Sequence, residues 1–216
     1  MIRCHRFIVV NAKGAIGIGA MIVFIAMVLV AGIAASVLVQ TTTKLETQAI
    51  KSGQETTSEV STGLAVENIE GHKSGTSIDE IGISVRPRAG TTFIDLSETV
   101  IEISDSSKKN LLVFDSTGFT DTSSVDGDFF TLSTFDGSST QFRVIVLQDA
   151  DGSCDLTSPV INRGDHVMLC VDVSNVFGGL TTNDDIFGTI IIEEGKPGPF
   201  DFSIPGLSNN VVYDLL

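Results

Sequence analysis

Apolar and polar residues are distributed very unevenly along this chain. Residues 15–39 contain no charged side chain, and Ser36 is the only strongly polar residue among them. As an α-helix, these 25 residues extend about 37 Å, which exceeds the roughly 30 Å hydrocarbon core of a bilayer. Because a helix satisfies its own backbone hydrogen bonds in lipid, the run predicts a membrane-spanning helix. A plain signal anchor is the simplest interpretation of this pattern.

Helical spacing continues beyond the apolar run. Leu45, Ala49, Val60 and Leu64 recur at about every third or fourth position among Thr, Gln, Lys and Glu, which indicates an amphipathic helix. We therefore predict one long helix over residues 15–62.

After residue 62 the pattern changes to short apolar or alternating runs, separated by turn residues such as Gly, Asp, Ser and Asn. This pattern is typical of an antiparallel sandwich. The predicted fold class is α+β, with a long N-terminal hydrophobic helix followed by an antiparallel, immunoglobulin-like β-sandwich over residues 63–216. The predicted strands are Leu64–Ile69, Ile81–Arg86, Val100–Ser104, Leu111–Asp115, Phe129–Phe135, Phe142–Leu147, His166–Val173, Phe187–Glu193 and Phe200–Ile204.

The formal net charge of −14 is concentrated in the predicted sandwich. Residues 63–216 hold 24 of the 27 acidic residues and 8 of the 13 basic ones. Phosphate binding needs clustered Lys and Arg, so this composition argues against nucleic acid as a partner. A large negative charge suits a protein that must stay soluble at high local concentration or in salt, although an ordinary solvated acidic surface explains it equally well.

The junction between the basic N-terminus and the apolar run is unusual. A secretory signal normally has its cleavage site after the apolar run, but here Lys13 and Gly14 directly precede Ala15, and no charge follows until Lys44. A cut after Gly14 would remove residues 1–14 as a leader and leave the whole apolar helix on the mature chain. Such a helix can lie in a membrane first and pack against copies of itself later.

Residues 13–66 resemble the N-terminal region of archaeal flagellins, the archaellins. The most specific parts are IGIG at residues 16–19 and VFIAMVLVA at residues 23–31. The C-terminal GKPGPFDFSIPGLSNNVVYDLL is also similar to archaellin C-termini. The family fold, a helix followed by a β-sandwich, agrees with the pattern described above. Further matching positions are Gln48, Gly53, Thr56, Thr57 and Val60.

The resemblance implies that a prepilin-type leader peptidase cuts after Gly14, reads Lys13 as the preceding basic residue, and leaves Ala15 as the new N-terminus. It further implies a structural subunit of the archaellum filament, a helical polymer of this chain and other archaellins that serves swimming. The implied partners are the membrane before assembly, then the archaellum motor and assembly machinery, with an extracellular filament as the final location. An archaeal type IV adhesion pilin with the same leader and helix is the alternative.

Two sets of helix positions are candidates for contacts between subunits. Small residues four positions apart let helices approach closely, and this spacing joins Ala31 with Ala35 and Gly32 with Ser36, although Ala and Gly are common in membrane helices anyway. The other set lies in the part that most resembles the archaellins. It consists of Ile16, Gly17, Gly19 and Phe24.

One acidic loop is a candidate metal site. The sequence DADGSCD places Asp149, Asp151 and Asp155 at positions one, three and seven around Gly152, like the first half of a calcium loop. An acid at position twelve is missing, and an acidic turn between strands is the alternative interpretation. We therefore expect no cofactor, with Ca²⁺ or another divalent metal at this loop as the open alternative.

The cysteines and histidines suggest no catalytic centre. A disulfide between Cys154 and Cys170 would close a loop of about 16 residues and stabilise the fold by about 3 kcal/mol, whereas a buried free thiol is the competing interpretation. No Ser/His/Asp or Cys/His arrangement is indicated, so we predict that the protein is not an enzyme. The sequence also lacks an Asn-x-Ser/Thr acceptor for N-glycosylation.

Overall fold

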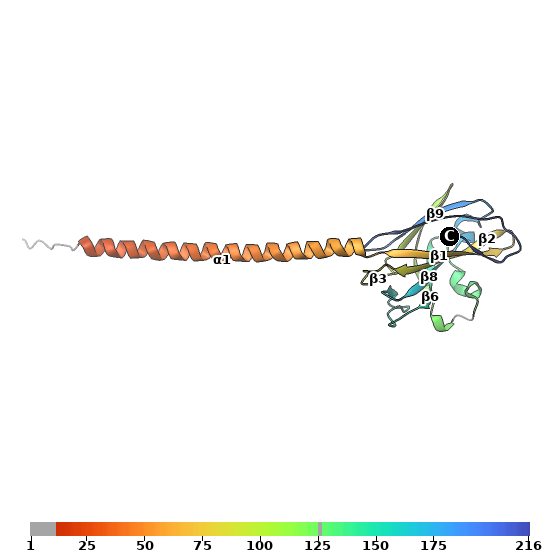
Figure 1. Cartoon of the computed structure of the whole chain (residues 1–216), viewed down its shortest axis with the longest axis horizontal. Helices are drawn as coiled ribbons and strands as arrows, with labels where there is room; N and C mark the ends of the chain where they lie inside the picture. The colour runs from red at the N-terminus through yellow and green to blue at the C-terminus, as the bar shows by residue number, and fades with distance from the viewer. Residues whose placement is uncertain (1–11, 125–126) are drawn as a thin grey trace, which may run out of the picture. The chain divides into compact units, whose positions relative to one another are not determined.

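The computed structural model describes residues 12–124 and 127–216, and it consists of two compact units, Met1–Gln54 and Glu55–Leu216. Helix α1 (Ala12–Ser61) is one continuous helix that occupies the first unit and enters the second (Figure 1). The predicted long N-terminal helix is therefore confirmed, and it ends within one residue of the predicted position. It is long and apolar enough to cross a membrane.

The polar half of α1 is helical although it is rich in threonine. The hydroxyls of Thr42 and Thr43 donate to the carbonyls of Leu38 and Val39, at 2.8 and 3.0 Å. These bonds satisfy side chains that would otherwise compete for backbone groups. The helix ends where Thr62 is buried and the chain continues as a strand.

The second unit is built on one nine-stranded sheet, with strand order β10-β9-β4-β5-β6-β8-β2-β1-β11. A two-residue pair, β3 with β7, lies outside this sheet. The strands are β1 (Leu64–Ser74), β2 (Ser77–Pro87), β3 (Ile94–Asp95), β4 (Val100–Asp105), β5 (Lys109–Thr120), β6 (Gln141–Gln148), β7 (Val160–Ile161), β8 (His166–Asp172), β9 (Asp185–Ile191), β10 (Gly198–Ser203) and β11 (Val212–Asp214).

The sheet encloses a single main core. Ile69 of β1 and Ile81 of β2 belong to the same buried cluster as Ile103 of β4 and Phe200 of β10, so both halves of the sheet contribute to one interior. Alternating side chains of each strand point into this interior, as the period of two requires. The predicted helix-plus-sandwich architecture is thus confirmed, and all predicted strands except one overlap strands of the structure.

The exception is the segment predicted as a strand at Phe129–Phe135, which was wrong. It forms two short 3₁₀ helices, η2 (Phe129–Thr131) and η3 (Ser133–Phe135), after a third at η1 (Thr122–Ser124). Phe130 and Phe135 pack with ring centroids 4.8 Å apart and join Ile145 and Met168 in a second buried cluster. These side chains are apolar because they cover the outer face of β6 and β8, and not because the segment pairs as a strand.

The sheet is antiparallel as predicted except in one place, where β5 and β6 pair in parallel. Parallel neighbours need a crossover connection rather than a tight hairpin. The long segment between Thr120 and Gln141, which holds the three 3₁₀ helices, is that connection. A short helix, α2 (Val173–Phe177), follows β8, and the side chain of Asp172 caps its N-terminus by accepting from the backbone N–H of Asn175.

Candidate assembly surface

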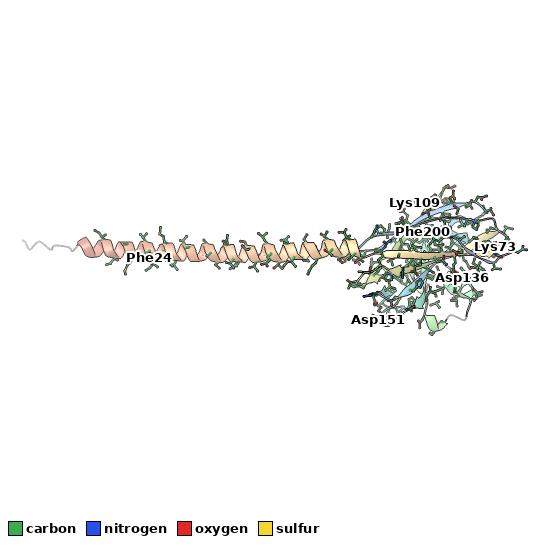
Figure 2. The ribbon with its side chains drawn as sticks, viewed as in Figure 1. Phe24, Lys73, Lys109, Asp136, Asp151 and Phe200 are labelled. Atoms are coloured by element: carbon green, nitrogen blue, oxygen red, sulfur yellow. The ribbon has the colours of Figure 1, made fainter. Side chains whose placement is uncertain are left out.

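The apolar half of α1 presents its side chains to the outside along its whole length. Every residue from 16 to 54 is exposed within the chain, and Figure 2 shows side chains projecting all around the helix, Phe24 among them. Phe24 is 69% exposed and Met21 is 71% exposed. A helix that is apolar on all sides is stable only when lipid or protein surrounds it. The chain alone leaves this surface uncovered.

The energetic consequence favours association. Burying apolar surface is worth about 25 cal/mol for each Å² removed from water, so even one large side chain of the type of Phe24 contributes about 2 kcal/mol when it is fully covered. In lipid this gain is largely absent between helices, because the tails are as apolar as the side chains. Helices with this surface can therefore remain apart in a membrane, and they associate strongly where the surface would otherwise be exposed to water.

The glycines of the apolar run have no structural role within the chain. A Cβ atom added at Gly17, Gly19 or Gly32 would meet no other group within 4 Å. A glycine inside a helix costs about 1 kcal/mol relative to alanine, so the chain itself gains nothing from these residues. Close approach by another helix is a physical reason for them.

The remaining predicted packing residues lie where the helical spacing places them. Ala31 and Ala35, and likewise Gly32 and Ser36, are one turn apart on the same face of α1. Ser36 accepts a hydrogen bond from Gln40 at 3.2 Å.

Helix α1 begins at Ala12, so the backbone of Lys13, Gly14 and Ala15 lies in its first turn. The side chains of these three residues and the whole of residues 1–11, including Cys4, lie outside the described part of the structure. Cleavage after Gly14 therefore stays a prediction.

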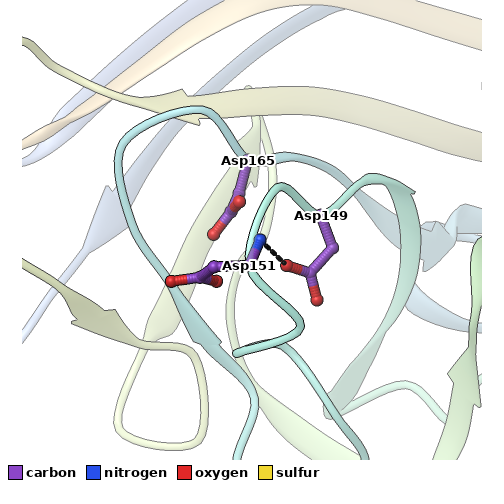
Figure 3. Close-up of side chains that lie close together, drawn as sticks. All are labelled: Asp149, Asp151 and Asp165. Carbon is purple, nitrogen blue, oxygen red and sulfur yellow. Dashed lines mark hydrogen bonds between the residues drawn. The ribbon is translucent and has the colours of Figure 1, made fainter.

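The acidic loop between β6 and β7 gathers a different set of carboxylates from the predicted one. Asp149 and Asp151 lie with Asp165, each offering an oxygen within 4.8 Å of the others (Figure 3). Asp155 is not part of this group, because its Oδ1 accepts from the backbone N–H groups of Thr157 and Ser158 and closes a turn of its own. The sequence spacing could not indicate Asp165, which reaches the cluster from the turn before β8.

The three carboxylates also have a role that needs no ion. Asp149 Oδ1 accepts from the backbone N–H of Gly152 at 2.7 Å, and Asp165 accepts from the backbone N–H groups of Ala150 and Asn162 at 2.9 and 2.8 Å. Hydrogen bonds from Ser153 and then Asn162 hold the pKa of Asp151 below its ordinary value. These bonds shape the loop, and calcium at this loop stays an untested alternative to the expectation of no cofactor.

Of the two interpretations of the cysteines, the structure agrees with buried free thiols and not with a disulfide between Cys154 and Cys170. Cys154 belongs to the main core, whereas Cys170 of β8 belongs to the cluster on the other face of the sheet. Its neighbours Leu169 and Val171 face the main core instead. Successive residues of a strand point to opposite faces, so the sheet itself separates the two sulfur atoms.

Both histidines of the described part pair with carboxylates of other strands, His72 across the β1–β2 ladder and His166 of β8 with Glu67 of β1. His72 Nδ1 lies 2.9 Å from Glu80 Oε2, and His166 Nε2 lies 3.2 Å from Glu67 Oε2. His72 also stacks on Phe130, with ring centroids 5.0 Å apart. These contacts give the histidines a structural role in the sheet.

The comparisons with known proteins agree with the architecture. The model of the archaeal-type flagellin family matches residues 14–202. The chain is 40% identical to flagellin B2 of Methanocaldococcus jannaschii, over 89% of each chain. It is 36% identical to flagellin B3 of Methanococcus voltae, over 95% of this chain and 97% of that one.

Solved structures show the same fold. The crystal structure of archaeal flagellin FlaB1 from Methanocaldococcus jannaschii matches with a TM-score of 0.63 and 29% identity, over 71% of this chain and 96% of that one. A structure of the archaeal flagellum of Methanospirillum hungatei matches with a TM-score of 0.62 over 93% and 98% of the two chains, at 13% identity, which supports the fold alone. The long apolar helix, the β-sandwich and the extent of these matches together show that the chain belongs to the archaeal-type flagellin family.

Proposed function

We propose that this chain is a structural subunit of the archaellum filament and polymerises through helix α1. The observation that carries the proposal is the fully exposed, uncharged surface of residues 16–39, in a chain of the flagellin family. A flagellin has a structural rather than a catalytic role. The partners of α1 in the filament are the same helices of other copies of this chain and of related archaellins.

The helix has two successive environments in this proposal. Before assembly it lies in the membrane, where its length and composition fit a bilayer. In the filament it lies among other helices, where burial against water holds the polymer together. The small residues Ala31, Gly32, Ala35 and Ser36 permit close contact in the second environment.

The proposal includes maturation of the N-terminus. A prepilin-type leader peptidase cuts between Gly14 and Ala15, and Lys13 supplies the basic residue before the cut. Its support is the sharp boundary between charge and apolar residues, together with a family match that begins at residue 14. Mass spectrometry of filament protein tests this step, because an N-terminus at Ala15 supports it and one at Met1 contradicts it.

In the filament the sandwich units form the outer wall and face water outside the cell. Residues 63–216 carry a large excess of acidic over basic residues. Such charge keeps separate filaments apart and soluble.

A matched pair of substitutions tests the role of α1. Phe24→Lys places a charge within the apolar surface, where burial without a partner is costly, and we expect cells to form no filaments. Gln54→Lys adds the same charge to the polar half of the helix and should leave filaments intact. Normal filaments from the Phe24→Lys variant would refute assembly through this surface.

Deletion separates the archaellum from an adhesion pilin. Cells without the chain should lose swimming if it is an archaellum subunit. Cells that swim normally but no longer attach to surfaces would identify an adhesion pilin instead.

A further inference from the structure

A hollow lined by arginine side chains lies on the sandwich unit, where the ends of β1, β2 and β8 meet. Its volume is about 460 Å³, and its lining includes Arg86, Arg88 and Arg163. Three of the eight basic residues of residues 63–216 therefore converge on one place, although this part of the chain is strongly acidic overall. The hollow belongs wholly to the second unit.

An irregularity in β1 shapes one wall of the hollow. Val66 pairs with Val85 and Asn68 pairs with Ser84, so Glu67 is an extra residue in β1 at this point. Such a bulge changes the direction in which a side chain points, here that of Glu67. Glu67 uses one oxygen for Arg86 Nε, at 2.5 Å, and the other for His166 Nε2, at 3.2 Å.

The second arginine, Arg88, is fixed by the backbone at the start of β1. The backbone N–H of Arg88 donates to the carbonyl of Gly63 at 2.8 Å, and its Nε donates to the carbonyl of Leu64 at 3.0 Å. A guanidinium group has five N–H donors. The two terminal nitrogens of Arg88 have no hydrogen bond within the described residues, and they remain available to an acceptor.

The third arginine, Arg163, stands in a hydrogen-bonded turn and has no partner in the described part of the chain. Asp165 is 2% exposed, and its two carboxylate oxygens accept hydrogen bonds from the backbone N–H groups of Ala150 and Asn162. These bonds hold the turn that presents Arg163, and they occupy the oxygens of Asp165, which makes no ion pair with Arg163. Arg163 is exposed and makes no hydrogen bond or ion pair with any residue that the structure describes.

The charge balance indicates what the hollow accepts. Its lining holds three arginines against two carboxylates, Glu67, which Arg86 and His166 already share, and the buried Asp165. Arginine binds carboxylates through paired hydrogen bonds. We propose that this hollow receives a carboxylate-bearing surface segment from a second copy of this chain in the filament, an inference that rests on the proposed function.

A second copy is the partner because its own surface supplies the complementary charge. Exposed carboxylates without a partner in the described residues include Glu98, Glu193 and Glu194. An acidic segment entering a basic hollow elsewhere on the next subunit makes a head-to-tail contact, and contacts of this type extend into an open polymer. The contact also relieves repulsion between units that are otherwise strongly negative.

The first test compares two charge reversals in the full chain, each expressed in place of the wild type. Arg163→Glu changes the hollow, and Lys108→Glu makes the same change of charge at an exposed lysine outside it. A charge pair at an interface contributes enough binding energy that we expect the yield of sheared filaments to fall about tenfold or more for Arg163→Glu relative to Lys108→Glu. Wild-type filaments confirm in the same experiment that the chain polymerises.

The second test identifies the partner directly and does not depend on a disruptive variant. Arg163→Lys keeps the positive charge and supplies an amine that a zero-length carbodiimide can join to a carboxylate in contact with it. Filaments of this variant should yield a covalent dimer, absent from wild-type filaments, in which residue 163 is linked to an Asp or Glu of a second copy. Reversing that acid to Arg together with Arg163→Glu should restore the filament yield.

Equal yields for Arg163→Glu and Lys108→Glu would overturn the proposal. A link from residue 163 to its own chain or to a different protein would overturn it as well, as would no link at all. Filaments that are stabilised by added inorganic sulfate, through Arg163 but without a link, would show a site for a free anion instead.

Discussion

Arg143 of β6 and Asp115 of β5 form a largely buried ion pair between two central strands of the sheet, with Nε 2.9 Å from Oδ2. The pair lies in the register break of the parallel β5–β6 ladder, between Phe114 and Phe119. Arg143 also donates through Nη1 to the carbonyl of Ser133 in η3, at 2.8 Å. One side chain therefore joins the parallel strands to their crossover connection.

We expect Asp115→Asn to destabilise the sandwich unit by about 3 kcal/mol, because it leaves a largely buried arginine without its counter-charge. Urea unfolding of the full-length protein in detergent measures the change. Glu102→Gln is the control, since Glu102 pairs with Lys109 on the surface and an exposed pair is worth less than about 1 kcal/mol. Equal effects of the two substitutions would contradict the structural role of the Asp115–Arg143 pair.

The same carboxylate predicts a dependence of stability on pH. Burial alone raises the pKa of Asp115, but hydrogen bonds from Thr117 and Arg143 outweigh it and hold the pKa below its ordinary value. The stabilisation is complete above the unfolded pKa of about 3.9 and is lost as the pH falls through the lower, folded value. Unfolding free energies at decreasing pH should therefore converge for wild type and Asp115→Asn, and a constant difference between them would contradict this assignment.

A second packing relationship joins β9 to β10. Gly188 pairs with Phe200, and a Cβ atom at Gly188 would lie 2.1 Å from Cζ of that ring. We expect Gly188→Ala to displace the ring and cost about 2 kcal/mol, measured as a lower unfolding midpoint. Gly206→Ala is the control, because its Cβ would meet nothing within 4 Å. A midpoint for Gly188→Ala equal to that of Gly206→Ala would show that Phe200 does not cover the glycine.

The cysteines should be unreactive in the folded protein. Burial, followed by the nearby charges of Asp149 and Asp165, raises the pKa of the Cys154 thiol to about 12. Burial also raises the pKa of Cys170. Since alkylation requires the thiolate, iodoacetamide at about pH 8 should modify neither residue until the protein is unfolded, when both should react. Peptide mapping that finds the two sulfur atoms linked would restore the disulfide hypothesis.

Much of the fold could be predicted because hydrophobic periodicity and turn residues mark the helix and most of the strands in the sequence. The uncharged run before residue 40 predicted the helix, and alternating runs predicted most strands. Phe129–Phe135 misled the prediction, because phenylalanines that cover a sheet from outside look in sequence like those inside a strand. Parallel pairing of β5 and β6 depends on the path of a long connection, which local pattern does not encode.

The loop and the hollow show why sites were harder to predict than strands. Asp149 and Asp151 are close in sequence, but Asp165 and Arg163 reach their places through the turn before β8, which no spacing rule relates to the earlier residues. The Cys154–Cys170 disulfide failed for a similar reason, since the face of a strand decides which residues meet. Calcium at the loop stays an untested alternative, and a calcium titration of the unfolding temperature, repeated with Asp149→Asn, would test it.

The central claim is that the apolar surface of α1 is buried against copies of itself in a filament. A high-resolution density map of filaments sheared from cells that express the chain tests it most directly. The account predicts that residues 16–39 of neighbouring copies pack together along the filament axis, with chains that begin at Ala15. A filament in which these residues lie at the outer surface, or make no contact between copies, would contradict it.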